Sequence, residues 1–400
     1  MPFLARQNKT NPDFGSAPTL VVGAGPSLDV FLAFLGENKS TDNSKTQKNP
    51  PSAGTNGPRF RHFAYGKIIA TDTALLPLLS RNIKPDILIA LEAQHWNLKD
   101  FIGTSRHSIP LVMDLSALPA TADCLGGNPR MVWTPWTELN IFSRLKTADL
   151  LPLRLEPLGS VGLSALALAL SLSKGDVVCA GLDFSFSPDS YHCRGSPGQQ
   201  SFLRNNTRLT SPYPTDAVFR NGTIPTLSKT GKAVRTDPAL QNYQALFKAE
   251  FAGNQRVFDI EGSGLPLGCR TLSMRDAVEK LKNGKELWAQ EEPAAIHEGE
   301  NRPGGPLFVP EKKEKLKAFI RIEKESLIEI REILSGRRES ADQRLDFLLD
   351  QTDYLWAHFP DCAGKGGRRP LSTDISFLNR IRAEIDPFLR LWEQAESDLE

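Results

Sequence analysis

Apolar residues in the first half of the chain fall in short continuous runs that are separated by polar and helix-forming stretches. The runs predict strands at 19–22, 67–71, 87–91, 110–113, 130–133 and 176–180. Such runs are typical of strands that are covered on both faces of a sheet. An Ala/Leu stretch from Val161 to Ser173 predicts a helix before the last of these strands. Because strands and helices alternate, the pattern predicts an α/β fold with a doubly wound, mostly parallel, Rossmann-like sheet.

In the second half of the chain the spacing of apolar residues predicts mostly helices. A helix is expected at about 237–252, a strand at 256–260 and a helix at 272–283, and these close the sheet domain. Three further stretches, at about 311–335, 338–358 and 372–397, have apolar stripes at helical spacing. The first stripe consists of Leu316, Phe319, Ile320, Leu327, Ile330 and Leu334. Stripes of this kind predict a C-terminal helical bundle.

The 400 residues are more than one hydrophobic core usually serves, and polar stretches indicate where the chain divides. We expect an N-terminal tail (1–18), a Rossmann-like domain (19–288), a linker (289–310) and a helical domain (311–400). Two stretches within the first domain lack apolar periodicity. Residues 37–60 predict a mobile insertion, and residues 185–235 predict a lid-like excursion over a ligand.

Charge and cysteine usage limit the class of protein. The net charge is +1, with 48 basic against 47 acidic residues, so nothing in the charge indicates a nucleic-acid or membrane partner. The five cysteines are widely spread, which fits a reducing compartment. The first residues have no apolar core of signal-peptide length, and no run is long enough for a membrane span. We therefore expect a cytoplasmic protein.

Residues 19–29 carry the first chemical signal, because a strand runs directly into Gly23-Ala24-Gly25-Pro26-Ser27. Glycines permit tight backbone geometry, and Pro26 and Ser27 suit the first positions of a helix. Free N–H groups at a helix N-terminus bind phosphate, so this loop predicts a nucleotide cradle. The alternative is a structural turn in which the glycines serve close packing only.

Ligands of doubly wound sheets bind beyond the carboxyl ends of the strands, and several polar residues stand there. They are Thr71, Asp72, Glu92 and Asp114, then Gly159 and Ser160 before the Ala/Leu helix, and Gly181 and Asp183 followed by Tyr191 and His192. Each has a structural alternative. Ser160 can simply cap its helix, Asp183 can bond loop backbone, Tyr191 can pack, and His192 can be an ordinary loop residue. Ser228-Lys229-Thr230-Gly231-Lys232 is not a P-loop, because the required preceding glycine and strand are missing.

In order and spacing these motifs resemble the MptE-like domain shared by motility-associated factor (Maf) glycosyltransferases and the archaeal 6-hydroxymethylpterin diphosphokinase. The resemblance rests on the 22–28 loop, Ala70-Thr71-Asp72, Pro85-Asp86, the 159–162 and 181–183 segments and Glu261-Gly262-Ser263-Gly264, and it runs from about residue 18 to 285. That family is in turn similar to sialyltransferases with a modified Rossmann fold, whose Gly-x-Gly-Pro-Ser-Leu loop holds a cytidine nucleotide.

The resemblance implies a role for each site residue. Gly23, Ala24, Gly25, Pro26 and Ser27 would bind the nucleotide, with Gly159, Ser160, Gly181 and Asp183 at its phosphate or the carboxylate of the sugar, and Thr71, Asp72 and Glu92 would face the donor sugar. Tyr191 would steady the departing phosphate, and His192 would act as the base. Two residues depart from the sialyltransferase pattern: Ser185 replaces a second tyrosine, and the usual histidine before Thr236 is missing.

The resemblance implies a glycosyltransferase that moves a nonulosonic, sialic-acid-like sugar from a CMP-activated donor to Ser or Thr of a protein such as flagellin. This reaction would need no cofactor. One alternative is an MptE-like 6-hydroxymethylpterin diphosphokinase, which would transfer pyrophosphate from ATP and need Mg²⁺, with Asp72, Asp114 and Asp183 as candidate ligands. Another is a non-catalytic nucleotide-binding scaffold.

Overall fold

The computed structural model describes residues 13–42, 66–105, 107–125, 129–136, 138–187, 190–204, 207–209, 222–288, 310–337, 342–359, 362 and 374–400. Its contacts divide the chain into two compact units. One contains Thr10–Arg130 and Leu155–Arg302, and the other contains Met131–Arg154 and Pro303–Glu400. The predicted division differs in one segment, because it assigned residues 131–154 to the sheet domain.

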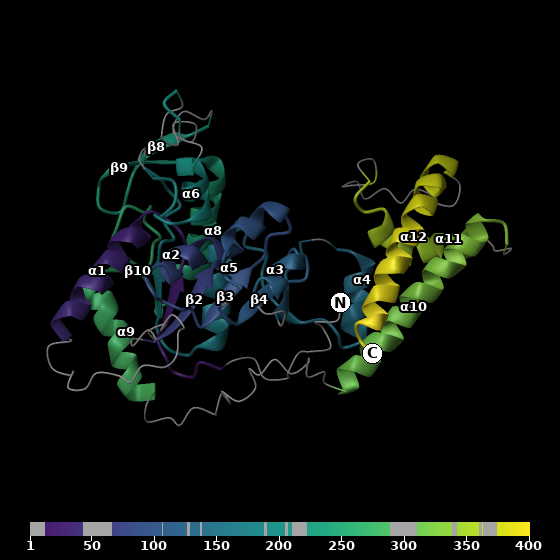
Figure 1. Cartoon of the computed structure of the whole chain (residues 1–400), viewed down its shortest axis with the longest axis horizontal. Helices are drawn as coiled ribbons and strands as arrows, with labels where there is room; N and C mark the ends of the chain where they lie inside the picture. The colour runs from purple at the N-terminus through teal and green to yellow at the C-terminus, as the bar shows by residue number, and fades with distance from the viewer. Residues whose placement is uncertain are drawn as a thin grey trace. The chain divides into compact units, whose positions relative to one another are not determined.

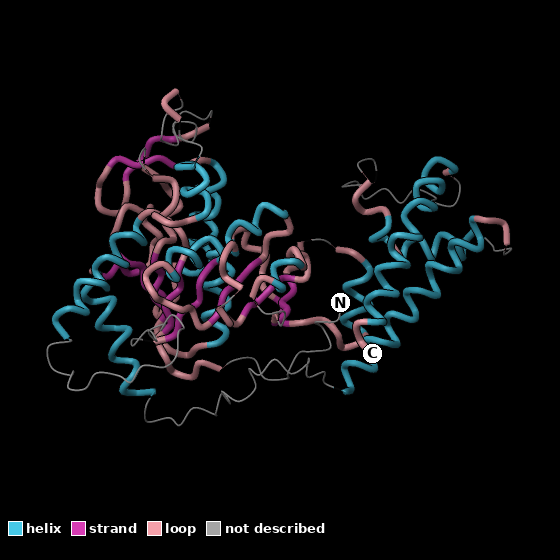
Figure 2. Tube along the Cα trace, viewed as in Figure 1, coloured by secondary structure: helices cyan, strands magenta, loops and turns pink. Residues whose placement is uncertain are grey.

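The first unit is built on a parallel sheet, whose strands Figure 2 shows in magenta. Its strands lie in the order β11-β10-β7-β1-β2-β3-β4. Their bounds are β1 Thr19–Val22, β2 Lys67–Thr71, β3 Ile87–Ala90, β4 Leu111–Asp114, β7 Val177–Ala180, β10 Val257–Ile260 and β11 Arg270–Leu272. The register of β1 aligns Thr19 with Lys67 of β2 on one side and with Val177 of β7 on the other. The predicted α/β class and parallel sheet are confirmed.

Helices of the first unit cover the two faces of this sheet, as Figure 1 shows. Their bounds are α1 Ser27–Asp42, α2 Leu75–Leu79, α3 Ala120–Asp123, α5 Val161–Leu172, α6 Pro197–Arg204, α8 Pro238–Phe251 and α9 Met274–Trp288, with 3₁₀ helices η2 Asp72–Ala74 and η3 His95–Phe101. From β1 the chain crosses the sheet toward β2, whereas it reaches β7 by crossing the sheet in the opposite direction. Right-handed crossovers therefore place α1 and α5 on opposite faces. Strands β1, β3 and β7 are buried throughout, as continuous apolar runs predict.

Two polar stretches hold more regular structure than the sequence pattern indicates. Helix α1 continues to Asp42, so the start of the predicted insertion is helical, and the rest of it (43–60) lies outside the described residues. The 185–235 excursion contains α6 and an antiparallel hairpin of β8 (Ile224–Leu227) and β9 (Ala233–Thr236). Three of the four residues of β8 are exposed, so the strand lacks the apolar signal on which the prediction depended.

The second unit packs α4 (Asn140–Thr147) against the C-terminal helices α10 (Pro310–Leu334), α11 (Asp342–Gln351) and α12 (Ile375–Ser397). It also contains the parallel pair β5 (Arg130–Trp133) and β6 (Leu153–Arg154) and the 3₁₀ helix η5 (Asp353–Leu355). The apolar stripe of α10 is buried, as predicted, but it includes the acidic Glu323. Arg144 of α4 compensates by donating from Nη2 to Glu323 Oε1 at 2.8 Å. The predicted linker lies, up to residue 309, outside the described residues.

No helix in the described part of the chain is long and apolar enough to span a membrane.

Candidate functional site

The predicted site residues gather beside β1, where the order in which the chain adds strands to the sheet reverses. Strand β1 has β2 on one side and β7 on the other, and the chain builds outward from β1 in both directions. In doubly wound sheets the crevice at such a switch point, outside the carboxyl ends of the strands, is where ligands bind. The loops after β1, β2 and β7 carry Gly23–Ser27, Asp72 and Gly181–Asp183 respectively. The fold therefore places these three motifs at one edge.

The glycines of the first loop serve close contact with the loop after β7. The Gly25 N–H donates to the Gly181 carbonyl at 2.8 Å, and the Gly23 N–H donates to the Ala180 carbonyl at 2.8 Å. A Cβ atom at Gly23 would lie 2.6 Å from the Gly181 oxygen. Gly181 itself has φ +70°, which favours glycine. The two loops are thus fitted backbone to backbone.

The N-terminus of α1 is occupied by the Asp183 carboxylate. Asp183 Oδ2 accepts from the Ser27 N–H at 2.7 Å, and Oδ1 accepts from Ser27 Oγ at 2.5 Å. Burial raises the pKa of Asp183, and the bonds from Ser27 act in the opposite direction. The expectation of free N–H groups in this loop is therefore wrong at Gly23, Gly25 and Ser27, because each donates within the protein. The structural alternative for Asp183, a carboxylate bonded to loop backbone, is what the structure shows.

The N-terminus of α5 is open by comparison. Ser160 is its N-cap residue, and the Ser160 side chain makes no capping hydrogen bond. The first amide bonded back in this helix is that of Ser164, which donates to the Ser160 carbonyl at 3.1 Å. The amides of the first turn before it have no intrahelical acceptor. A helix N-terminus of this kind attracts anions.

The two helix starts are neighbours through one side chain. A Cβ atom at Gly162, in the first turn of α5, would lie 2.5 Å from Leu182 Cδ2, and one at Gly23 would lie 2.6 Å from the same atom. Leu182 therefore separates the glycine loop from the first turn of α5. Gly159 precedes that turn with φ +73°, and a Cβ there would lie 3.0 Å from the Tyr243 ring. The tight packing explains why both positions are glycine.

Tyr191 and His192 are brought against the glycine loop. The Cys193 N–H donates to the Ala24 carbonyl at 2.9 Å, and the backbone of Ala24 also interacts with the His192 side chain. Burial lowers the pKa of His192, and the Ala24 contact only partly opposes this shift. The imidazole is therefore neutral at pH 7 and able to accept a proton. The Tyr191 ring packs with centroid distances of 4.8 Å to both Phe186 and His192.

The predicted sugar-facing residues lie one and two strands further along. Thr71 and Asp72 are buried at the end of β2, whereas Glu92, after β3, is exposed. Burial is the largest cause of a raised Asp72 pKa, to which the charge of Glu92 contributes. The segment after His192 closes toward this region, because a Cβ at Gly195 would lie 3.8 Å from Pro77 Cα of α2.

A buried cation that no local sequence pattern indicates lies at the same edge. Lys229, in the β8–β9 turn, donates to Asp259 Oδ2 and, at 2.7 Å, to the Ile260 carbonyl. Both side chains of the ion pair are buried, and the charge of Lys229 also acts on Asp183. The Ser228–Lys232 segment is a hairpin turn, which confirms that it is not a P-loop. The burial of Lys229 becomes visible only in the folded chain, through its contact with Asp259, 30 positions away.

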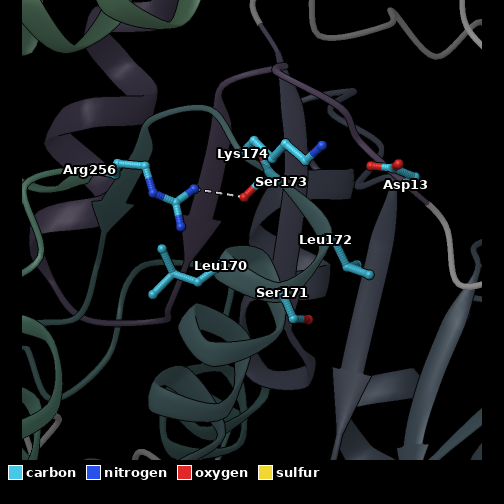
Figure 3. Close-up of a pocket in the computed structure, with 7 residues that line it drawn as sticks. All are labelled: Asp13, Leu170, Ser171, Leu172, Ser173, Lys174 and Arg256. Carbon is cyan, nitrogen blue, oxygen red and sulfur yellow. Dashed lines mark hydrogen bonds between the residues drawn. The ribbon is translucent and has the colours of Figure 1, made fainter.

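A pocket of about 530 Å³ lies at the opposite edge of the sheet (Figure 3). Its lining residues are Asp13, Leu170, Ser171, Leu172, Ser173, Lys174 and Arg256. Arg256 precedes β10 and donates to the Ser173 carbonyl at 2.8 Å, so its guanidinium already binds backbone. The pocket contains none of the predicted site residues. Since ligands of this fold class bind at the carboxyl ends of strands, the carboxyl edge remains the candidate site.

Comparison with known proteins bears on the family of the chain. Residues 51–189 match the family model described as 6-hydroxymethylpterin diphosphokinase MptE-like. An uncharacterised protein of Treponema pallidum (strain Nichols) is 30% identical over 394 residues, which cover 96% of this chain and 62% of that protein. The chain therefore spans less than two thirds of the length of this relative.

A solved structure, a Maf glycosyltransferase from Magnetospirillum magneticum AMB-1, is also similar to the chain. The alignment covers 100% of this chain and 57% of that one, with 13% identity and a TM-score of 0.45. At these values the likeness bears on neither fold nor activity, and the fold assignment rests on the strand order described above.

Proposed function

Because residues 51–189 match the MptE-like family model, we propose that this chain is a glycosyltransferase of the Maf type. The donor is a CMP-activated nonulosonic sugar, and the acceptor is a Ser or Thr hydroxyl of a protein such as flagellin. The open N-terminus of α5, beside the glycine loop and the Tyr191-His192 pair, carries this proposal. It supplies an anion site at the switch point of the sheet.

The contacts favour a division of roles among the predicted residues. The donor phosphate, or the carboxylate of the sugar, binds the α5 N-terminus through Ser160 Oγ and the first-turn amides, since Asp183 occupies the α1 N-terminus. Gly23–Ser27 and Gly181 form the wall against which the nucleotide lies. Thr71, Asp72 and Glu92 face the sugar from the ends of β2 and β3.

His192 is the proposed base. Its neutral imidazole takes the proton from the acceptor hydroxyl while the hydroxyl oxygen bonds to the anomeric carbon. The bond from that carbon to the phosphate oxygen breaks, and CMP leaves with the bonding electron pair. Tyr191 and Ser160 stabilise the negative charge on the departing phosphate. The part of the 185–235 excursion around Tyr191 and His192 is the part proposed to close over the donor, and residues 188–189, 205–206 and 210–221 lie outside the described residues.

The test compares His192→Ala with His358→Ala, a control at an exposed histidine of the helical unit. CMP-N-acetylneuraminic acid serves as the donor, and turnover is measured as release of CMP and as transfer of the sugar to a peptide hydroxyl. Binding of CMP is measured separately by calorimetry. We expect His192→Ala to lose transfer by roughly a hundredfold or more, while CMP binding and the control variant are unchanged. Full transfer by His192→Ala removes it as the base.

The second candidate is pyrophosphate transfer from ATP to a hydroxymethyl pterin, which the description of the matching family favours. That reaction would need Asp72, Asp114 and Asp183 as Mg²⁺ ligands, but within the described residues no three acidic, histidine or cysteine side chains are placed together to hold a metal ion, and Asp183 is bonded to Ser27. A thermal-shift titration separates the candidates. Stabilisation by CMP without metal supports sugar transfer, and stabilisation only by ATP with Mg²⁺ supports the diphosphokinase. Binding of nucleotide without turnover of any donor indicates a non-catalytic nucleotide-binding protein.

A further inference from the structure

Two successive backbone amides after His192 are bonded to the region where α1 begins. The Cys193 N–H donates to the Ala24 carbonyl at 2.9 Å. The next amide, that of Arg194, donates to Asp29 Oδ2 at 2.8 Å. Asp29 lies in the first turn of α1, so a side chain of that helix binds the chain two residues beyond His192. The backbone on this side of the imidazole is therefore tied to the helix that follows the glycine loop.

The Asp29 carboxylate is itself held from a second helix. Arg81, just after α2, donates from Nη2 to Asp29 Oδ1 at 3.2 Å and from Nη1 to the Pro77 carbonyl at 3.3 Å. The two oxygens of Asp29 thus bond different partners, one a guanidinium and the other the Arg194 amide. The Asp29 side chain is only 20% exposed. Hydrogen bonds to an ionised acceptor are stronger than neutral ones, so Asp29 is a firm anchor for this amide.

The segment is also anchored on the other side of His192. Phe186 exchanges two backbone hydrogen bonds with Arg235 of β9, each 2.8 Å long. His192 therefore lies on a span of chain between two anchors. The Ala24 and Arg235 contacts are made by backbone, whereas the Asp29 contact is made by a side chain. A single substitution at Asp29 can therefore release one anchor without changing the others.

The surroundings of the imidazole depend on where this span lies. A Cβ at Gly198 of α6 would lie 3.6 Å from His192 Cδ2, so the helix covers one side of the ring. Burial lowers the pKa of His192 from its ordinary value of 6.5, and the Ala24 backbone partly opposes this shift. The charged groups of the elements around it are not among the causes of the shift: they are Asp29, Arg81, Arg194 and Arg204. A looser span would admit water to the ring and raise this pKa.

We propose that Asp29 is a positioning residue for His192, because its carboxylate fixes the Arg194 amide and so the place of the imidazole beside the glycine loop. The placement rests on the contacts of Asp29 alone. Its consequence for catalysis rests on the function proposed above, in which His192 takes a proton from the acceptor hydroxyl. A base must lie within hydrogen-bond reach of that proton, so a small displacement of the span lowers turnover. Binding of the donor phosphate at α5 is not affected.

The first measurement follows the His192 imidazole in the full chain by NMR titration of ¹³C-labelled histidine, with the signal assigned by its loss in His192→Ala. In Asp29→Ala we expect the pKa of His192 to rise toward 6.5, because the released span admits water. Removal of a negative charge alone would lower the pKa instead, so the direction separates the two causes. Asp29→Asn keeps an acceptor oxygen for the Arg194 amide and should titrate like wild type.

The matched control is Asp276→Ala, which removes a carboxylate from the first turn of another helix, α9. It should leave the His192 titration unchanged. Arg81→Ala leaves Asp29 in place but removes its second partner. It should move the titration in the same direction as Asp29→Ala, but by less.

The second measurement is transfer from CMP-N-acetylneuraminic acid, with CMP affinity determined by calorimetry on the same proteins. Asp29→Ala should lower kcat roughly tenfold while the affinity for CMP is unchanged. Asp29→Asn should retain most of the turnover, and Asp276→Ala all of it. A general loss of structure would instead weaken CMP binding together with turnover.

The two measurements separate the role of Asp29 from the proposed reaction. An unchanged His192 titration in Asp29→Ala and Arg81→Ala overturns the positioning role. Equal shifts in Asp29→Ala and Asp29→Asn also overturn it, because the charge and not the placed acceptor would then be the cause. Wild-type turnover by Asp29→Ala overturns its part in the reaction. If the wild-type protein transfers no sugar, the proposed function fails, whereas the imidazole titration still decides the role of Asp29.

Discussion

Helices α1 and α5 begin at the same edge of the sheet, yet only one of their N-termini is bonded to a side chain. The start of α1 is closed by the Asp183 carboxylate, which accepts both the N–H and the Oγ–H of Ser27. The start of α5 has no side-chain cap. A Gly-Ala-Gly-Pro-Ser motif therefore specifies a helix start without specifying that its amides are free.

The origin of the difference is a long-range contact. Ser27 and Asp183 are 156 positions apart, and they meet because β1 and β7 are neighbours in the sheet. Gly25 and Gly264 make room for the carboxylate, since a Cβ at either position would lie within 2.8 Å of an Asp183 atom. The closed terminus is therefore a structural device that joins three loops, whereas the N-terminus of α5 has no side-chain cap.

Removing the internal carboxylate should have the largest effect. Asp183→Ala leaves the buried Ser27 N–H without an acceptor and removes a negative charge from a helix N-terminus. We expect a loss of about 3 kcal/mol in the free energy of unfolding, measured by urea denaturation at pH 7. Asp183→Asn keeps an acceptor oxygen and should cost less than half as much. Equal stability of Asp183→Ala and wild type would show that the contact does not hold the edge together.

The second prediction concerns the serines at the two helix starts, whose replacement should have opposite effects on CMP affinity and on stability. Ser160→Ala should weaken CMP binding roughly tenfold, about 1.4 kcal/mol, with little change in stability, because its hydroxyl caps nothing in the free protein. Ser27→Ala should do the reverse and cost about 1 kcal/mol of stability while CMP affinity is unchanged. Calorimetric titration and urea denaturation of both variants form a matched pair. A stronger effect of Ser27→Ala on CMP affinity would reverse the assignment.

The smallest predicted effect concerns pH and the carboxyl of Asp100, which lies on η3 and accepts a hydrogen bond from Thr73 Oγ1 at 3.1 Å. Because burial and the charge of Asp72 raise its pKa from 3.8 to about 7, the native state binds more protons than the unfolded state between these values, and stability falls as pH rises through this window. Asp100→Asn removes the ionisation. It should therefore be more stable than wild type at pH 8 by about 1 kcal/mol, after allowance for solvent screening of a half-buried group. At pH 4 the two proteins should unfold alike, and thermal unfolding at the two pH values checks this.

Much of the sheet could be predicted because its signal is local. The run at 87–90 and the centre of the run at 67–71 are apolar, since both faces of these strands are covered, and the structure confirms both strands. The β8–β9 hairpin could not be predicted, because Ile224–Leu227 is largely exposed and contains Pro225. Glu323 breaks the apolar stripe of α10, and its partner Arg144 lies far away in the sequence.

The candidate site likewise has a part that the sequence predicts and a part that it does not. The residues at strand ends, such as Asp72 and Asp183, follow from the rule that ligands bind at the carboxyl edge. The contacts that each of these residues makes do not follow from that rule. Asp100 lies in a 3₁₀ helix whose residues carry no periodic signal, and Lys229 lies in a hairpin turn, so only the folded chain brings them to the edge.

A crystal structure of the protein with CMP bound would show directly which helix N-terminus binds the phosphate. We expect the phosphate within hydrogen-bond distance of Ser160 Oγ and the amides of Val161 and Gly162, with the contact between Ser27 and Asp183 intact. A phosphate bound at Ser27 with Asp183 displaced, or crystals that take up no CMP at saturating concentration, would contradict this expectation.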